Sequence, residues 1–342
     1  MVYHKIGNLP LSSNNPKLLT HVGVTYDTSS PEKELEKAIA AVECGSDIIA
    51  DVSLGGKWKE TLMLLIKNIS VPITSLPGYI LATQNGDAKL NNDLSHSEIL
   101  DITEEVLSYG VSGFTIHSAF KKKHIDMIKN SNRVFPFTSR MGNYIKKYIN
   151  STGKENPFYE CFTDIVKLAK KYDATISLGT ALRSPSIVNN GGFDNLFKSE
   201  ISEMSELVKI CNDYNVSVMI EGVGHIQINK MKEWYDFSKE ACLNAPLRAL
   251  PMPTDRALGH DNVAGAIAAA FLANMGVEVI CTMTRAEHIA HPTLEDIKES
   301  VTNFKIALTC INPDLKAEKK SSFSQKSRRM SCFRGNKKCH RP

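Results

Sequence analysis

The chain has 342 residues, of which 42% are hydrophobic and 23% charged, which is typical of a globular protein and excludes a disordered or fibrous one. No apolar run reaches the ~18 residues of a membrane span, and residues 1–15 lack the cationic and apolar blocks of a secretory signal. The net charge of +4 is uneven, because residues 315–342 contain ten Lys or Arg and one acid, which leaves a mildly acidic body. We therefore expect a cytoplasmic protein that binds neither membranes nor nucleic acid.

Short β-branched segments alternate with amphipathic segments through most of the chain. Strands are predicted at residues 19–24, 47–52, 71–76, 113–117, 133–138, 175–179, 216–221, 246–251 and 277–283. Helices are predicted at residues 31–44, 57–69, 95–109, 158–172, 200–214, 228–242, 263–275 and 293–310. The first helix has the clearest limits, because Ser30 can cap it, Pro31 suits its first turn and Gly45 follows its end. This alternation indicates parallel βαβ winding.

The number of strand segments decides between two α/β architectures. A closed (β/α)8 barrel needs eight strands, so one of the nine segments is expected to lie outside it. An open doubly wound sheet is the alternative, but no G-x-G-x-x-G motif follows any predicted strand. We predict a TIM-type barrel over residues 19–314, an extension at residues 1–18 and a disordered basic tail at residues 315–342.

Polar residues follow nearly every predicted strand, where a barrel places its active site. His225 and His288 each follow a late strand and are candidate metal ligands, since two neutral imidazoles leave positions of a divalent ion open. Glu221 precedes His225 by four residues and can complete or orient that site. The alternative is that each histidine is an ordinary hydrogen-bonded residue.

A second group of residues suits a phosphorylated ligand. Ser139 and Gly142, in a loop after a predicted strand, offer a hydroxyl and backbone N–H groups, and Arg183 offers a guanidinium to the same anion. His117 and Tyr79 suit hydrogen bonds to a heterocycle or a ribose. Each of these segments can also be an ordinary turn.

Several segments taken together resemble the phosphomethylpyrimidine synthase family of thiamine biosynthesis, whose anaerobic relatives include the 5-hydroxybenzimidazole synthases of cobamide assembly. The segments are GSDIIADVSLGG, VPITSLPGY, GFTIHS, TSRMG, ENPFYECF, ISLGTALR, VSVMIEGVGH and EVICTMTRAEHIAHP. The resemblance implies a (β/α)8 barrel that binds aminoimidazole ribotide. It also implies a radical carbon–carbon lyase that rearranges this ribotide with S-adenosylmethionine and a [4Fe-4S] cluster.

The same motif matches imply roles for individual residues. The implied metal ligands are His225 and His288, with zinc or iron as the ion. The implied catalytic residue is Glu221, in the IEGVGH segment. The implied substrate contacts are His21, Tyr79, His117, Ser139, Gly142, Arg183, Glu221 and His260.

The chain departs from the family at positions that face the substrate ring. His21 stands where the family's N-A-N-I-G has an amide, and His260 where its A-P-G-Y-D-H has a phenol. Thr180 stands where D-G-L-R has a carboxylate. The phosphate-type residues agree better, which predicts the same anionic anchor with different ring chemistry. We expect 5-hydroxybenzimidazole synthesis for the lower ligand of vitamin B12, with the thiamine pyrimidine as the alternative product.

The family's cluster motif, C-x2-C-x4-C, is incomplete in this sequence. Cys332 and Cys339 are present, but Gly335 replaces the second cysteine and Cys339 comes one residue early for the third. A cluster that leaves one iron open for S-adenosylmethionine needs three thiolates. We expect a cluster segment truncated or frameshifted near Ser331.

Two other classes of function remain open at this point. The first is an inactive barrel that binds the ribotide or serves as the partner subunit of a complete paralogue. For the protein in general we expect a homodimer or a heteromer with such a paralogue. The second is an unrelated metal-dependent barrel enzyme that acts on a phosphorylated substrate, which rests on likeness of fold alone.

Overall fold

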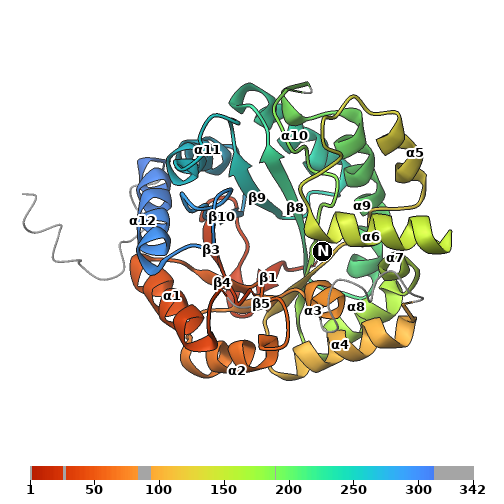
Figure 1. Ribbon diagram of the computed structural model, residues 1–342, viewed down its shortest axis with the longest axis horizontal. Coiled ribbons are helices and arrows are strands. Elements are labelled where there is room, and N and C mark those ends of the chain that lie inside the picture. Colours follow the sequence, from red (N-terminus) through yellow and green to blue (C-terminus); the bar gives the residue numbers. More distant parts are fainter. Residues whose placement is uncertain (1, 26–27, 84–93, 189, 312–342) are drawn as a thin grey trace, which may run out of the picture.

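A closed barrel of parallel strands forms the centre of the protein, in a computed structural model that describes residues 2–25, 28–83, 94–188 and 190–311. The strand order is β10-β3-β4-β5-β6-β7-β8-β9, and β10 also pairs with β9 to close the ring (Figure 1). The barrel strands are β3 (Lys17–Val22), β4 (Ile48–Asp51), β5 (Ile73–Ser75), β6 (Gly113–Ile116), β7 (Thr175–Leu178), β8 (Val218–His225), β9 (Leu247–Met252) and β10 (Val279–Cys281). The predicted (β/α)8 TIM-type fold is confirmed.

Helices surround the barrel and shield its strands from solvent (Figure 1). They are α1 (Pro31–Cys44), α2 (Trp58–Asn68), α3 (Pro77–Thr83), α4 (His96–Ser108), α5 (Lys123–Lys129), α6 (Arg140–Thr152), α7 (Pro157–Glu160), α8 (Phe162–Lys171), the 3-10 turn η2 (Asn190–Gly192), α9 (Asn195–Asp213), α10 (Ile228–Ala241), α11 (Asp261–Met275) and α12 (Leu294–Ile311). Among the described residues, no helix combines the length and apolar character that a membrane crossing requires.

Local sequence explains the clearest element limits. Ser30 accepts a hydrogen bond from the Lys33 N–H at the start of α1, and Gly45 ends that helix with a φ of 109°. Because the helices cover the outside of the barrel, strands β4 and β6 are buried along their whole length. This burial matches their apolar sequences, IIAD and GFTI.

The strand predicted at residues 133–138 is wrong, because this segment is a loop between α5 and α6. Two of its apolar side chains are not core residues, since Val134 is 78% exposed and Phe135 is 67% exposed, whereas Phe137 is buried in the core. Pro136 lacks the N–H that a central strand needs. This is the segment that lies outside the eight-stranded barrel.

A small antiparallel hairpin near the amino terminus lies against the starts of the strands. It consists of β1 (Lys5–Ile6) and β2 (Leu9–Pro10). The Lys5 N–H donates to Ser217 Oγ at 3.0 Å, just before β8 begins, and Ile6 is fully buried. The hairpin therefore covers the amino-terminal end of the barrel and leaves the opposite end for the site.

Candidate functional site

Two guanidinium groups flank one carboxylate at the carboxyl ends of the strands. Glu221 of β8 pairs with Arg183, whose Nη1 also donates to the Thr180 carbonyl at 2.9 Å. The second oxygen of Glu221 lies 3.6 Å from Nη1 of Arg248, which comes from β9. Burial by itself raises the pKa of Glu221, but Arg183 and Arg248 outweigh burial and hold it at about 2. Glu221 is therefore ionised at neutral pH and accepts hydrogen bonds.

Two histidines beside this carboxylate are neutral. Burial, reinforced by the charge of Arg248, lowers the pKa of His21 to about 3. Burial lowers the pKa of His117 to about 4. The His21 Nε2 lies 2.9 Å from Nη2 of Arg248, and a guanidinium can only donate, so Nε2 accepts and Nδ1 carries the proton. Neither imidazole supplies a positive charge, and both can hydrogen-bond to a ligand.

Tyr79 and His117 border the same narrow cavity, which is too small to admit a water molecule in this structure. Tyr79 lies in the first turn of α3, and burial raises the pKa of its hydroxyl. His117 has room because residue 179 is glycine: a Cβ there would lie 2.6 Å from its Nε2. The cavity is lined by Leu76, Gly78, Tyr79, Thr115, Ile116, His117, Met141 and Phe158.

The predicted phosphate-binding residues lie at a helix terminus and not after a strand. Ser139 caps α6 and accepts from the Gly142 N–H at 3.1 Å. Ser139 is buried, and a Cβ at Gly142 would come within 2.9 Å of the Phe137 ring. The start of α6 offers partly positive N–H groups to an anion. Arg183, predicted to share that anion, is paired with Glu221.

His225 and His288 come together, although 63 positions separate them. Their ring centroids are 5.2 Å apart. The Nδ1 of His225 lies 2.8 Å from Asp255, and the Nδ1 of His288 lies 3.2 Å from Asp261. A carboxylate on Nδ1 is the usual support of a metal-binding imidazole, because it leaves Nε2 for the ion. Burial lowers the pKa of His225, which favours the neutral form that binds metal.

The histidine pair is not joined by a third protein ligand in the part of the chain that the structure describes. A divalent ion held by these two imidazoles would take its other ligands from water or substrate. The carboxylate-supported histidine pair is compatible with an open site, and the metal itself stays a prediction.

One described residue of the predicted site does not join these groups. His260 is exposed directly before α11, and its side chain does not cap that helix. Cys332 and Cys339 lie outside the described residues.

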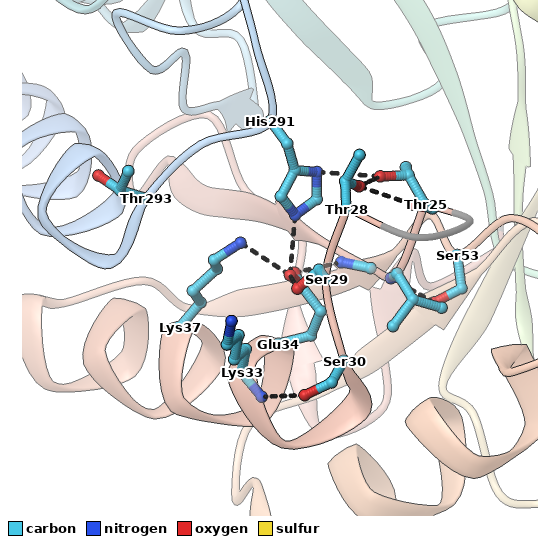
Figure 2. Close-up of polar contacts among 12 residues, drawn as sticks. Thr25, Thr28, Ser29, Ser30, Lys33, Glu34, Lys37, Ser53, His291 and Thr293 are labelled. Atoms are coloured by element: carbon cyan, nitrogen blue, oxygen red, sulfur yellow. Dashed lines mark hydrogen bonds and ion pairs between the residues drawn. The ribbon is translucent and has the colours of Figure 1, made fainter.

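A buried carboxylate connects two loops of the barrel rim, and sequence reasoning missed it (Figure 2). Glu34 of α1 accepts from the Gly23 N–H at 2.9 Å, from Lys37 at 2.7 Å and from Ser29. It also lies 2.8 Å from Nε2 of His291, three residues after His288. The segment after β3 is thereby joined to the segment that carries a candidate metal ligand. An acid in the first turn of a helix is normally read as a partner of the helix dipole, which hid this role.

Arg248 is the other residue that sequence reasoning missed. A usable signal was present, because Arg248 is the only charged residue in the apolar segment LRALPM. A cation in an otherwise buried strand indicates an internal polar network.

Comparisons with known proteins extend these observations. Residues 12–341 match the Radical SAM ThiC family. The chain is 35% identical over 293 residues to phosphomethylpyrimidine synthase of Thermotoga petrophila, which covers 85% of this chain and 69% of the relative. The same enzyme of Carboxydothermus hydrogenoformans is 35% identical over 297 residues, covering 85% and 68%. Dihydropteroate synthase of Thermus thermophilus shares the fold alone, with a TM-score of 0.52 and 12% identity over 91% of this chain and 99% of that one.

Proposed function

Because the chain belongs to the Radical SAM ThiC family, we propose that its barrel binds aminoimidazole ribotide and serves the lyase reaction of the phosphomethylpyrimidine synthases. The observation that carries this proposal is the convergence of Arg183, Glu221 and His117 at one end of the barrel, beside the paired imidazoles. This is the end at which barrel enzymes place their substrates.

Each group has a binding role that follows from its charge state. The first turn of α6, capped by Ser139, would hold the phosphate through backbone N–H groups. Ionised Glu221 would accept a hydrogen bond from the amino group of the ring. Neutral His117 and Tyr79 would orient the ring without adding charge.

The paired imidazoles of His225 and His288 would hold a zinc or iron ion. When bound, such an ion supplies a Lewis acid with open positions for substrate oxygen or nitrogen. Asp255 and Asp261 would keep both rings oriented, so their removal should weaken metal binding as well.

The cysteines near the end of the sequence are too few for the [4Fe-4S] cluster of the family. Cys332 and Cys339 supply two thiolates, whereas an open iron for S-adenosylmethionine needs three. The same shortage favours a second candidate function, a ribotide-binding subunit that works beside a complete paralogue.

A different product of the lyase reaction is favoured by one feature of the site. His21, bonded to Arg248, stands where the family has an amide, so the polar groups at this end of the barrel differ from the family's. This supports 5-hydroxybenzimidazole as the product in place of the thiamine pyrimidine.

An anaerobic assay of the full chain tests these functions. The protein is reconstituted with iron and sulfide, mixed with aminoimidazole ribotide, S-adenosylmethionine and a reductant, and analysed by mass spectrometry. Phosphomethylpyrimidine supports the proposal, and 5-hydroxybenzimidazole supports the other product. Ribotide binding with neither product nor cluster supports the partner subunit, and an absence of ribotide binding rejects all three.

The variant Glu221→Gln provides the matched test of the site. It keeps the shape of the side chain but removes the charge between two guanidinium groups, so ribotide affinity should fall at least tenfold. Glu206→Gln, at an exposed carboxylate of α9, is the control and should bind as the unmodified chain does.

A further inference from the structure

Arg248 crosses the inside of the barrel and is almost completely buried, at 2% exposed. Its Nε lies 3.3 Å from Cys281 of β10, and its Nη1 donates to Thr115 of β6 at 2.9 Å and to Ser177 of β7 at 3.4 Å. Its Nη2 donates to His21 of β3 at 2.9 Å. The guanidinium is therefore held in place by four strands other than its own.

These four acceptors leave the charge of Arg248 without a counter-ion. Two are hydroxyls, burial raises the pKa of the Cys281 thiol, and His21 is neutral. Among the described residues, Glu221 is the carboxylate that pairs with Arg248, at 3.6 Å, and its other oxygen is taken by Arg183. The buried Arg248 and the partly buried Arg183 thus share one carboxylate, an arrangement that costs free energy unless another negative group approaches.

The arrangement also leaves hydrogen-bond donors free. Nη2 of Arg248 carries two hydrogens and has one acceptor, His21, among the described residues. His21 is half-buried, so a ligand at the strand ends can reach it, and its Nδ1 carries a proton. The nearby cavity wall includes Thr115, which is bonded to Arg248. Two hydrogen-bond donors, Nη2 of Arg248 and Nδ1 of His21, therefore lie close together beside the positive charge of Arg248.

We propose that Arg248 and His21 form a subsite for a second anionic group of the ligand, separate from its phosphate. This inference rests on the proposed function, which assigns the phosphate to the first turn of α6. The ligand class is a phosphorylated ribosyl-aminoimidazole whose ring carries a carboxylate. The carboxylate accepts hydrogen bonds from Nη2 of Arg248 and Nδ1 of His21 and supplies the missing negative charge.

Titration calorimetry with the full chain tests the subsite. The probes are aminoimidazole ribotide and the same ribotide carrying a ring carboxylate. The unmodified protein should bind the carboxylated ribotide about tenfold more tightly, as expected for a charge-assisted contact. Arg248→Met should abolish this preference, and Arg248→Lys should keep part of it. Arg256→Met, at an exposed arginine in the loop before α11, should keep all of it.

Equal affinities in the unmodified protein, or an unchanged preference in Arg248→Met, would overturn the subsite and leave the proposed function standing. A second measurement separates the two ideas if neither ribotide binds. Imidazole-4-carboxylate should then raise the melting temperature, imidazole-4-carboxamide should not, and the difference should vanish in Arg248→Met. No such difference would overturn the subsite as well. If Arg248→Met does not fold, Arg248→Lys takes its place. A carboxylate preference smaller than that of the unmodified chain supports the subsite, and an equal preference overturns it.

Discussion

Two buried carboxylates at the rim of the barrel differ in charge because they receive different numbers of donors. Burial alone raises the pKa of Glu34, but hydrogen bonds from His291, Lys37, Ser29 and Gly23 outweigh it and hold the pKa at about 2. Asp51, at the end of β4, receives Ser53 N and Oγ on one oxygen, and its Oδ2 has no partner among the described residues.

Burial therefore decides the pKa of Asp51 and raises it to about 7. At neutral pH Glu34 is ionised, whereas Asp51 is close to half protonated. The number of donors around each carboxylate decides its charge state.

Glu34→Gln should destabilise the protein at pH 7 and much less at pH 3. The pKa of Glu34 is lower in the folded state, so its contribution is complete above the unfolded value of 4.5 and is lost as pH falls toward 2. The pKa shift corresponds to a loss on the order of 3 kcal/mol at pH 7. Urea unfolding at both pH values measures it, with the exposed Glu36→Gln on the same helix as control. An equal loss at both pH values would contradict the assigned charge state.

Asp51→Asn should change the pH dependence in the opposite sense. The pKa of Asp51 is raised in the folded state, so its contribution is complete below 3.8 and is lost as pH rises through 7. The amide cannot ionise, so the variant should gain stability relative to the unmodified chain between pH 5 and pH 8.5. Thermal unfolding across this range checks it, and parallel curves for the two proteins would rule out a buried titrating Asp51.

At the scale of elements, the amino-terminal and carboxyl-terminal ends of the barrel have different roles. The hairpin β1–β2 packs on the starts of the strands, whereas the loops after the strands carry the candidate site. One of these loops touches the site directly: a Cβ at Gly192 of η2 would lie 1.7 Å from the carbonyl oxygen of His225. Changes at the two ends should therefore have different consequences.

Ile6→Ala should lower stability without changing the site. Ile6 is fully buried beneath the barrel, and removing a buried isoleucine side chain typically costs ~2–5 kcal/mol. Thermal unfolding measures the loss, and Tyr3→Ala, at a side chain 68% exposed in the same segment, is the control. Ribotide affinity should stay the same, and a parallel fall in affinity would mean that the two ends are coupled.

Gly192→Ala should displace His225 and weaken divalent metal binding. The φ of Gly192 is 89°, and the added methyl would collide with the His225 backbone. Gly110→Ala is the matched control, because its φ is 94° but nothing lies within 4 Å of the added carbon. Metal titration should separate the variants, and equal metal affinities would show that η2 does not support His225.

At the scale of the whole molecule, the described chain closes its own barrel. Pairing of β10 with β3 joins the last strand to the first, and α12 packs against α1. The core and the histidine pair both belong to this closed unit. Divalent metal binding should accordingly depend on the barrel and not on residues 315–342.

The histidines and the tail can be separated by metal analysis. His225→Ala with His288→Ala should lose divalent metal, while deletion of residues 321–342 should retain it with a nearly unchanged melting temperature. Elemental analysis after dialysis measures the metal. Full metal occupancy in the double variant would exclude the site. Loss of an iron–sulfur chromophore on deletion would show that the tail is catalytic.

The sequence by itself determined the architecture and the general position of the site. Alternation of strand and helix signals predicted the barrel, because each signal depends on local periodicity and capping, as at Ser30 and Gly45. Barrel enzymes carry their active-site residues after the carboxyl ends of the strands, and this rule predicted that His225 and His288 lie at one rim. The exception, residues 133–138, carried apolar residues that local pattern cannot distinguish from a buried strand.

Only the tertiary structure decided which charges meet. Arg248 bonds His21 across 227 positions, and Glu34 meets His291 across 257. The hydrophobic periodicity of the sequence gives no information on such partners, because they come together only when the ring of strands closes. Burial and neighbouring charge then decide whether Glu221, Asp51 and His21 are ionised, and both are properties of the folded barrel rather than of any segment.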